Sequence, residues 1–219
     1  MQGTSDLSRL TSAGLCQAER AGLALLQEYG TMPVTALYAS PLTRVQQTVS
    51  AVSAEWVSVA AAIEGGVLDD LKEVELRDWT GKLSADVQRD SPDAYRAWKE
   101  TPSAFEMSGG FRPVVDLWRR AESCWQQMRS DGAGGAEDSC TLVVAHNGIN
   151  QALLCTALGI GIEGFRAIAW PNCGAIELIW LEGVTTASRW RWVLPQEKGS
   201  EWLSSIDLEG ERRDVFGTV

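Results

Sequence analysis

The sequence is short of long hydrophobic runs, of positive charge and of histidine, of which His146 is the only one. No stretch of about 18 apolar residues occurs, so we expect no membrane-spanning helix and no membrane partner. The first residues, MQGTSDLSRLTSAG, have no basic region followed by an apolar core, so we expect no signal peptide there. The net charge of −10 argues against a nucleic-acid partner, although a locally positive pocket could still take a small anion.

Cysteine is sparse, and no two cysteines are spaced as C-x-x-C, so zinc and redox motifs are absent. The five cysteines are expected to be free thiols in a reducing compartment, with Cys16 and Cys155 buried on helices. The sequence also has no G-x-S-x-G elbow and no P-loop, which excludes a typical serine hydrolase and a P-loop nucleotide site.

The remaining composition, 45% hydrophobic and 22% charged over 219 residues, is typical of one sizeable globular domain. We expect this domain to span residues 1–195, followed by a polar tail at residues 196–219. Ten tryptophans are present, and most are expected to pack in the core or at the rim of a cleft.

Helical and strand patterns alternate along the chain. Thr11 is typical of a helix N-cap, and the helix that it would start runs to about Gln27. The other expected elements are a strand VTALYA, a helix from Leu42 to Trp56, a loop-rich segment from Asp69 to Gly81, a helical region from Ser84 to Arg129, a surface loop SDGAGGAEDS, a strand CTLVVA, a helix NGINQALLCTALG, and strands in CGAIELIW and SRWRWVL. This order predicts a doubly wound α/β fold with a mostly parallel sheet between two helix layers.

Two segments place polar residues directly after a predicted strand. Ser40 and Arg44 follow VTALYA, and His146, Asn147 and Gly148 follow CTLVVA. Ligands of α/β sheets bind beyond the carboxyl ends of the strands, where helix amino ends supply backbone N–H groups and positive potential. An arginine fork, an imidazole and helix amino ends at one edge would form a phosphate pocket.

Each of these residues has a simpler interpretation when it is considered alone. A lone histidine is usually structural, and a lone arginine on a helix is usually solvated. The phosphate hypothesis therefore depends on Arg44 and His146 both lying at strand ends.

Four segments resemble a known family in their order and spacing: LTSAGLCQAERAG, YASPLTRVQQT, LKEVELRDWTGK and VVAHNGINQAL. They are similar to the histidine phosphatases of the phosphoglycerate mutase-like superfamily, over roughly Gln2 to Trp180. YRAWKETPSAF, AHNGINQALLCTALGIG and FRAIAWPNCGA further resemble the 2-carboxy-D-arabinitol-1-phosphate phosphatase branch of that superfamily. The resemblance implies the phosphoglycerate mutase-like α/β/α sandwich.

The resemblance also implies roles for individual residues. Arg44 would clamp the phosphate, and His146 would be the charge-stabilising phosphate ligand. Glu73 would protonate the leaving oxygen and then activate water. Glu75 is the near alternative, since strand alternation would place it on the same face as Glu73, and a solvated loop carboxylate is the simpler interpretation of Glu73.

Four further residues complete the site that the resemblance implies: phosphate contacts from Asn147 and Gly148 at the helix start, and from Gln2 and Gly3 in a loop. The substrate would be a small phosphomonoester such as a sugar phosphate, of the 2-carboxyarabinitol 1-phosphate type. No metal and no cofactor are expected, because arginine, imidazole and helix ends would meet the phosphate charge. The compartment would be the cytoplasm or the plastid stroma, and the sequence indicates no oligomeric state.

One element of the family is missing. The family opens with a strand that ends in Arg-His-Gly, whose histidine is the nucleophile, whereas this sequence starts at MQGTSD, inside the corresponding loop. No other histidine can replace it, so the chain is expected to be inactive and poorly stable, with TALYA and TLVVA as the two neighbours of the missing strand. Either the chain is a fragment of an active phosphatase, which we favour, or it is a degenerate homologue that only binds phosphorylated ligands or partners.

Overall fold

The structure is a computed structural model that describes residues 1–30, 32–56, 59, 64–132, 140–180 and 185–194. Its strands are β1 (Val34–Ala39), β2 (Glu64–Val67), β3 (Cys140–Val144), β4 (Ala175–Ile179) and β5 (Arg189–Leu194). The first three form a parallel sheet in the order β2-β1-β3, and β4 pairs with β5 in an antiparallel sheet.

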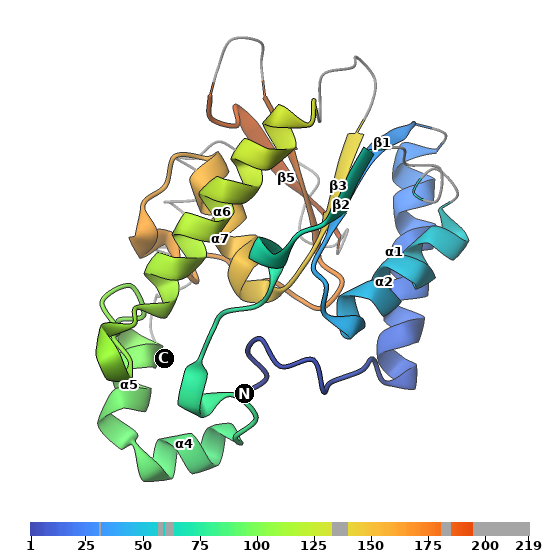
Figure 1. The fold of residues 1–219 in the computed structure, drawn as a ribbon. Helices are drawn as coiled ribbons and strands as arrows, with labels where there is room; N and C mark the ends of the chain where they lie inside the picture. The colour runs from blue at the N-terminus through green and yellow to red at the C-terminus, as the bar shows by residue number, and fades with distance from the viewer. Residues whose placement is uncertain (31, 57–58, 60–63, 133–139, 181–184, 195–219) are drawn as a thin grey trace.

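Helices lie on both sides of these strands, which makes three layers (Figure 1). The helices α1 (Ser12–Tyr29) and α2 (Thr43–Glu55) form one layer, and α6 (Pro113–Ser130) and α7 (Asn147–Ala157) form the other. Two shorter helices, α4 (Ser84–Asp90) and α5 (Pro92–Glu100), follow two single turns of 3-10 helix at Asp69–Leu71 and Arg77–Trp79, and further such turns lie at Ser108–Gly110 and Ile162–Gly164. The α/β/α class that the sequence predicted is confirmed.

The parallel pairing of β1 and β3 places the two segments of interest side by side. Leu37 is opposite Leu142, and Ala39 is opposite Val144, so the two strands end at the same level. The N–H of Ser40 donates to the carbonyl of Val144 at 3.1 Å, which extends the pairing one residue beyond β1. TALYA and TLVVA hydrogen-bond directly to each other in this chain, so the unpaired backbone groups that were expected on their facing edges are not found among the described residues.

The helices α1 and α2 pack closely because a glycine lies at their contact. Thr11 caps α1 as predicted, because its Oγ1 accepts a hydrogen bond from the N–H of Gly14 at 3.1 Å. A Cβ on Gly22 would lie 2.9 Å from the carbonyl oxygen of Val52, so glycine lets α1 approach the backbone of α2. On the other side of the sheet, Leu117 and Ile149 are completely buried.

Three sequence-based expectations differ from the structure. The helical region from Ser84 to Arg129 is interrupted between α5 and α6, where Gly109 and Gly110 adopt positive φ values of 73° and 74°. β2 was not anticipated, because two of its four residues are glycines, which are depleted in strands. Cys16 is exposed rather than buried, whereas Cys155 is buried, and all five cysteines are free.

Two other features concern the ends of the chain and the membrane. The polar tail at residues 196–219 and residues 133–139 of the expected surface loop lie outside the described residues. Within the described part of the chain, no helix combines the length and the apolar character that crossing a membrane requires.

Candidate functional site

Arg44 lies in the first turn of α2, directly after the end of β1. Its guanidinium donates to two backbone carbonyls of the amino-terminal segment, that of Ser5 at 2.8 Å and that of Gly3 at 3.1 Å. Burial lowers the pKa of Arg44, and the nearby carboxylates of Glu73 and Asp6 partly offset that effect. Arg44 is thus a partly buried cation whose partners along the chain are neutral carbonyl groups.

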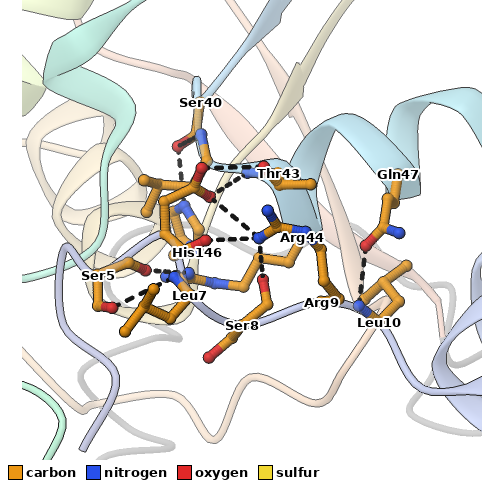
Figure 2. Close-up of polar contacts among 12 residues, drawn as sticks. Ser5, Leu7, Ser8, Arg9, Leu10, Ser40, Thr43, Arg44, Gln47 and His146 are labelled. Atoms are coloured by element: carbon orange, nitrogen blue, oxygen red, sulfur yellow. Dashed lines mark hydrogen bonds and ion pairs between the residues drawn. The ribbon is translucent and has the colours of Figure 1, made fainter.

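His146 lies at the N-cap of α7, directly after β3, with only 8% of its surface exposed. Its Nε2 is 2.8 Å from Oγ of Ser40, so the ends of β1 and β3 are joined by a side-chain contact (Figure 2). Burial lowers the pKa of His146 to about 3, and the positive charges of Arg44 and Arg120 add to that shift. The imidazole is therefore neutral at pH 7 in this structure.

Glu73 approaches the same site from the segment between the two 3-10 turns. Its Oε1 accepts hydrogen bonds from the N–H of Gly148 at 3.0 Å and from the N–H of Val74 at 2.8 Å. Burial raises the pKa of the Glu73 carboxyl, and these two hydrogen bonds, with Arg44 and Arg120, act in the opposite direction. A Cβ at position 148 would lie 2.5 Å from Oε1, so the contact requires glycine there.

The segment that carries Glu73 is held in place by Arg120 of α6, a residue that the sequence analysis missed. Arg120 is 7% exposed, and its guanidinium donates to the carbonyls of Lys72 at 2.7 Å, Asp70 at 3.1 Å and Glu73 at 3.3 Å. Its Nε also donates to Asp116 at 2.7 Å. The one available signal was its position three residues after the buried Leu117, on the apolar face of α6.

Glu75, the alternative carboxylate, has different surroundings. It accepts hydrogen bonds from the hydroxyl of Thr4 at 2.9 Å and from the N–H of Arg77 at 2.7 Å. The segment between the 3-10 turns is not a strand, so the alternation argument for Glu75 does not apply. Of the two carboxylates, only Glu73 has a hydrogen bond to the start of α7 among the described contacts.

The predicted phosphate contacts are placed unequally. Gly3 is buried beside Arg44 and has a φ of 52°. A Cβ at this position would lie 2.8 Å from Oγ1 of Thr80. Gln2 is exposed, and its carbonyl accepts the N–H of Ser5 at 3.2 Å.

At the start of α7, Gly148 is buried against Glu73, whereas Asn147 is exposed. The side-chain amide of Asn147 donates to the carbonyl of Trp170 at 3.1 Å and accepts from Gln151. The structure therefore brings together Arg44, Glu73, His146, Gly148 and Gly3, and it directs the Asn147 amide elsewhere.

These groups have the chemical properties needed to bind an anion and to transfer a proton. A guanidinium and a neutral imidazole can donate to an anion, and a carboxyl with a raised pKa can hold a proton for transfer. Within the described ranges, no group of three histidine, cysteine or acidic side chains is arranged to hold a metal ion.

A comparison with known families identifies the relationship. The family model of the histidine phosphatase superfamily (branch 1) matches residues 1–193. The chain belongs to the histidine phosphatase superfamily. The resemblance that the sequence motifs indicated is thereby confirmed.

Curated relatives agree with this assignment. The chain is 37% identical over 175 residues to a protein of Arabidopsis thaliana named "Probable 2-carboxy-D-arabinitol-1-phosphatase", and 35% identical over 175 residues to the 2-carboxy-D-arabinitol-1-phosphatase of Triticum aestivum. Both alignments cover 80% of this chain but only 33% and 32% of the plant proteins. The chain thus spans about a third of the length of these relatives.

Solved structures share the fold. A mycobacterial glucosyl-3-phosphoglycerate phosphatase in complex with VO3 matches with a TM-score of 0.67 and 24% identity, over 88% of each chain. The alpha-ribazole phosphatase of Shigella flexneri matches with a TM-score of 0.66 and 18% identity, over 85% of this chain and 84% of its own. This likeness confirms the phosphoglycerate mutase-like architecture.

Proposed function

We propose that the site of histidine phosphatase type described above, when it is completed in the full protein, hydrolyses small phosphomonoesters through a phosphohistidine intermediate. The convergence of Arg44, Glu73 and His146 at the ends of two adjacent strands is the observation that carries this proposal. Arg44 would bind phosphate oxygens in place of neutral carbonyls, because charge-assisted hydrogen bonds to an anion are stronger. His146 would donate to the phosphoryl group, and Glu73 would give its proton to the leaving alcohol.

Sugar phosphates are the substrate class that we propose. The support comes from the names of the two plant relatives and of a mycobacterial relative, a glucosyl-3-phosphoglycerate phosphatase that is 28% identical over 116 residues. These substrates share a phosphate on a polyhydroxylated or carboxylated carbon skeleton. An alkyl leaving group of this kind is a poor one, so it requires the proton that Glu73 would supply.

The nucleophile is the part of the mechanism that His146 does not supply. We propose that a second histidine, at the end of a strand with the Arg-His-Gly motif, completes the site in the full protein, and that the 219-residue chain alone is inactive. The support is the single histidine of the sequence, whose Nε2 is already in contact with Ser40. A phosphohistidine mechanism needs one imidazole that is free to attack.

The test compares this chain with a form extended by its own upstream coding sequence. The extended form should hydrolyse nitrophenyl phosphate and sugar phosphates without added metal, and it should yield an acid-labile phosphohistidine. The 219-residue chain should do neither. Turnover by the 219-residue chain would show that a nucleophile other than a second histidine is used.

The role of Glu73 has its own test in the extended form. Glu73→Gln should slow phosphorylation by alkyl phosphates more than by nitrophenyl phosphate, whose leaving group needs little protonation. Glu75→Gln is the matched control, since it removes a carboxylate two residues away that bonds Thr4 instead. Equal slowing of both substrates in Glu73→Gln, or selective slowing in Glu75→Gln, would reject the assignment.

A non-catalytic phosphate-binding protein is the second candidate. The single histidine favours it, because a site with Arg44 and His146 alone could bind phosphate without turnover. Vanadate binding by the extended form, with neither turnover nor phosphohistidine, would favour this second function. We place either function inside the cell, in the cytoplasm or the plastid stroma, because all five cysteines are free.

A further inference from the structure

Ser40 is a completely buried polar residue between the ends of β1 and β3, and the proposed chemistry gives it no role. Its backbone is fixed on both sides: the N–H donates to the carbonyl of Val144 at 3.1 Å, and its carbonyl accepts from the side chain of Gln46 at 2.7 Å. Its Oγ accepts a hydrogen bond from the N–H of Leu42 at 3.3 Å and lies 2.8 Å from Nε2 of His146. The hydroxyl is therefore held in one place beside the imidazole (Figure 2).

The hydrogen bonds of this hydroxyl determine which imidazole nitrogen carries the proton. Oγ already accepts from the N–H of Leu42, so its own hydrogen is the one group that still needs an acceptor. Nε2 of His146 supplies that acceptor if it is unprotonated, and the proton of the neutral ring then sits on Nδ1. The opposite tautomer would direct Nε2–H at Oγ and leave a buried hydroxyl hydrogen without a described acceptor.

The resulting tautomer matches the ligand. No hydrogen bond to Nδ1 is found within the described part of the chain, so Nδ1–H is available as a donor. A phosphate oxygen accepts hydrogen bonds, so it would be attracted by Nδ1–H and repelled by the lone pair of the other tautomer.

We propose that Ser40 is a positioning residue that fixes His146 in the Nδ1–H tautomer and directs this N–H at the phosphoryl group. The inference rests on the proposed function only for the identity of the ligand. The contact between Ser40 and His146 itself is independent of catalysis.

The test uses nuclear magnetic resonance on protein labelled with ¹⁵N in the imidazole. Because the chain has one histidine, its two ring nitrogens give the only imidazole signals, and they need no further assignment to a residue. In the wild-type chain near neutral pH, Nδ1 should be protonated and Nε2 should not. A protonated Nε2 in the neutral wild-type ring would overturn the proposal without any variant.

Variants then test whether Ser40 is the cause. Ser40→Ala should convert the ring to a mixture of tautomers or to the Nε2–H form, and Ser40→Thr, which keeps the hydroxyl, should restore Nδ1–H. Ser50→Ala is the matched control, because it removes an exposed hydroxyl of α2 that binds the carbonyl of Gln46. An unchanged tautomer in folded Ser40→Ala would overturn the proposal.

Binding of orthovanadate, measured by calorimetry, separates this inference from the proposed function. Ser40→Ala should weaken binding by about twofold to tenfold, the effect of one misdirected hydrogen bond, and Ser50→Ala should not. If the tautomer behaves as expected but the extended form binds no vanadate, the tautomer assignment stands and the phosphate site is rejected. Equal affinity of the wild type and Ser40→Ala for vanadate would reject the role of Ser40 in directing His146 at the ligand.

Discussion

The ends of β1 and β3 are adjacent and parallel, yet the two halves of the site that they carry are held in different ways. At the end of β3, His146 and Gly148 are buried, and both contact side chains that are themselves fixed by the core, Ser40 and Glu73. After the end of β1, the guanidinium of Arg44 has described hydrogen bonds only to the carbonyls of Gly3 and Ser5. The positions of His146 and Gly148 are therefore set by packing in the core, whereas the position of the Arg44 guanidinium depends on the amino-terminal segment.

This difference indicates how a ligand could enter. A carbonyl is a neutral acceptor, so a phosphate could replace it on Arg44 with a net gain from charge-assisted hydrogen bonds. Glu73 and His146 have no such exchangeable partners among the described residues, because they contact buried groups directly after β1, at the start of α7 and in the segment before the second 3-10 turn. We therefore expect substitutions that disturb His146, Gly148 or Glu73, which we call the β3 side, to change stability. Substitution of Arg44, on the β1 side, should change mainly phosphate binding.

The largest effect is expected for Arg120→Met, which should lower the free energy of unfolding by about 3–5 kcal/mol, because it removes a partly buried ion pair and the carbonyl contacts that hold the Glu73 segment. Denaturant unfolding measures it. Arg119→Met is the matched control, since Arg119 is exposed and also bonds Asp116, and it should stay within about 0.5 kcal/mol. Similar losses for the two variants would show that Arg120 does not hold the β3 side.

Next in size is Arg44→Ala, which should weaken the binding of phosphate or vanadate by about 1.5–3 kcal/mol, the contribution of hydrogen bonds to a charged group. Calorimetry measures the affinity. Arg9→Ala is the control, because it removes an exposed positive charge that also bonds backbone carbonyls of the amino-terminal segment. Unchanged affinity in folded Arg44→Ala would remove Arg44 from the site.

A slightly smaller effect, about 1–3 kcal/mol of destabilisation, is expected for Gly148→Ala, because the new methyl group would displace the buried Glu73 carboxyl from its hydrogen bond. Gly14→Ala in the first turn of α1 is the control. Its Cβ would meet no atom closer than 3.5 Å, so it should be neutral or stabilise by up to about 1 kcal/mol. If both variants behave alike in thermal unfolding, the close approach of Glu73 to α7 is wrong.

The smallest predicted effect comes from pH. The pKa of His146 is lowered in the folded protein, so between its ordinary value near 6.5 and about 3 the unfolded chain binds a proton that the folded chain does not. Stability should therefore fall as the pH decreases below 6.5, by about 1.4 kcal/mol per unit. Glu73, whose pKa is raised, has the opposite sign and loses its contribution as the pH rises above 4.5.

The comparison that isolates His146 is between the wild type and His146→Gln from pH 6.5 to 5.5. The difference between their free energies of unfolding should change by about 1 kcal/mol over this interval, because the unfolded imidazole is already half protonated at pH 6.5. Parallel curves would mean that His146 is not buried in its neutral form. Added phosphate should raise the pKa of His146, because an anion favours the charged ring.

Local patterns explain why much of the site could be predicted. Arg44 and His146 were found because each follows an apolar strand, and parallel strands end at the same edge of a sheet. Glu73 came from the family resemblance and not from any local pattern. Its distinction from Glu75 depends on Gly148, which is 75 residues away, and no periodicity could anticipate a contact in a segment without regular structure.

Arg120 and Ser40 show what local patterns cannot reveal. Arg120 lies in a region that the sequence predicted to be helical, and its guanidinium binds carbonyls about 50 residues earlier. Ser40 was noticed as a residue after a strand, but its contact with His146 spans 106 residues. In both cases, the side chain is buried and polar, and its partner is defined only when segments distant in the sequence pack together.

The sequence by itself determined the α/β/α class, the order of most helices and strands, the family, and the residue types at the two strand ends, because hydrophobic periodicity, caps and short motifs are local properties. The tertiary structure decided that β1 and β3 are direct neighbours, that Glu73 rather than Glu75 meets α7, and that the Asn147 amide is directed away from Arg44. It also decided the contact between the buried hydroxyl of Ser40 and the imidazole of His146. These outcomes depend on which polar groups become buried next to each other when distant segments pack. That pairing is a property of the folded chain as a whole and not of any local stretch of sequence.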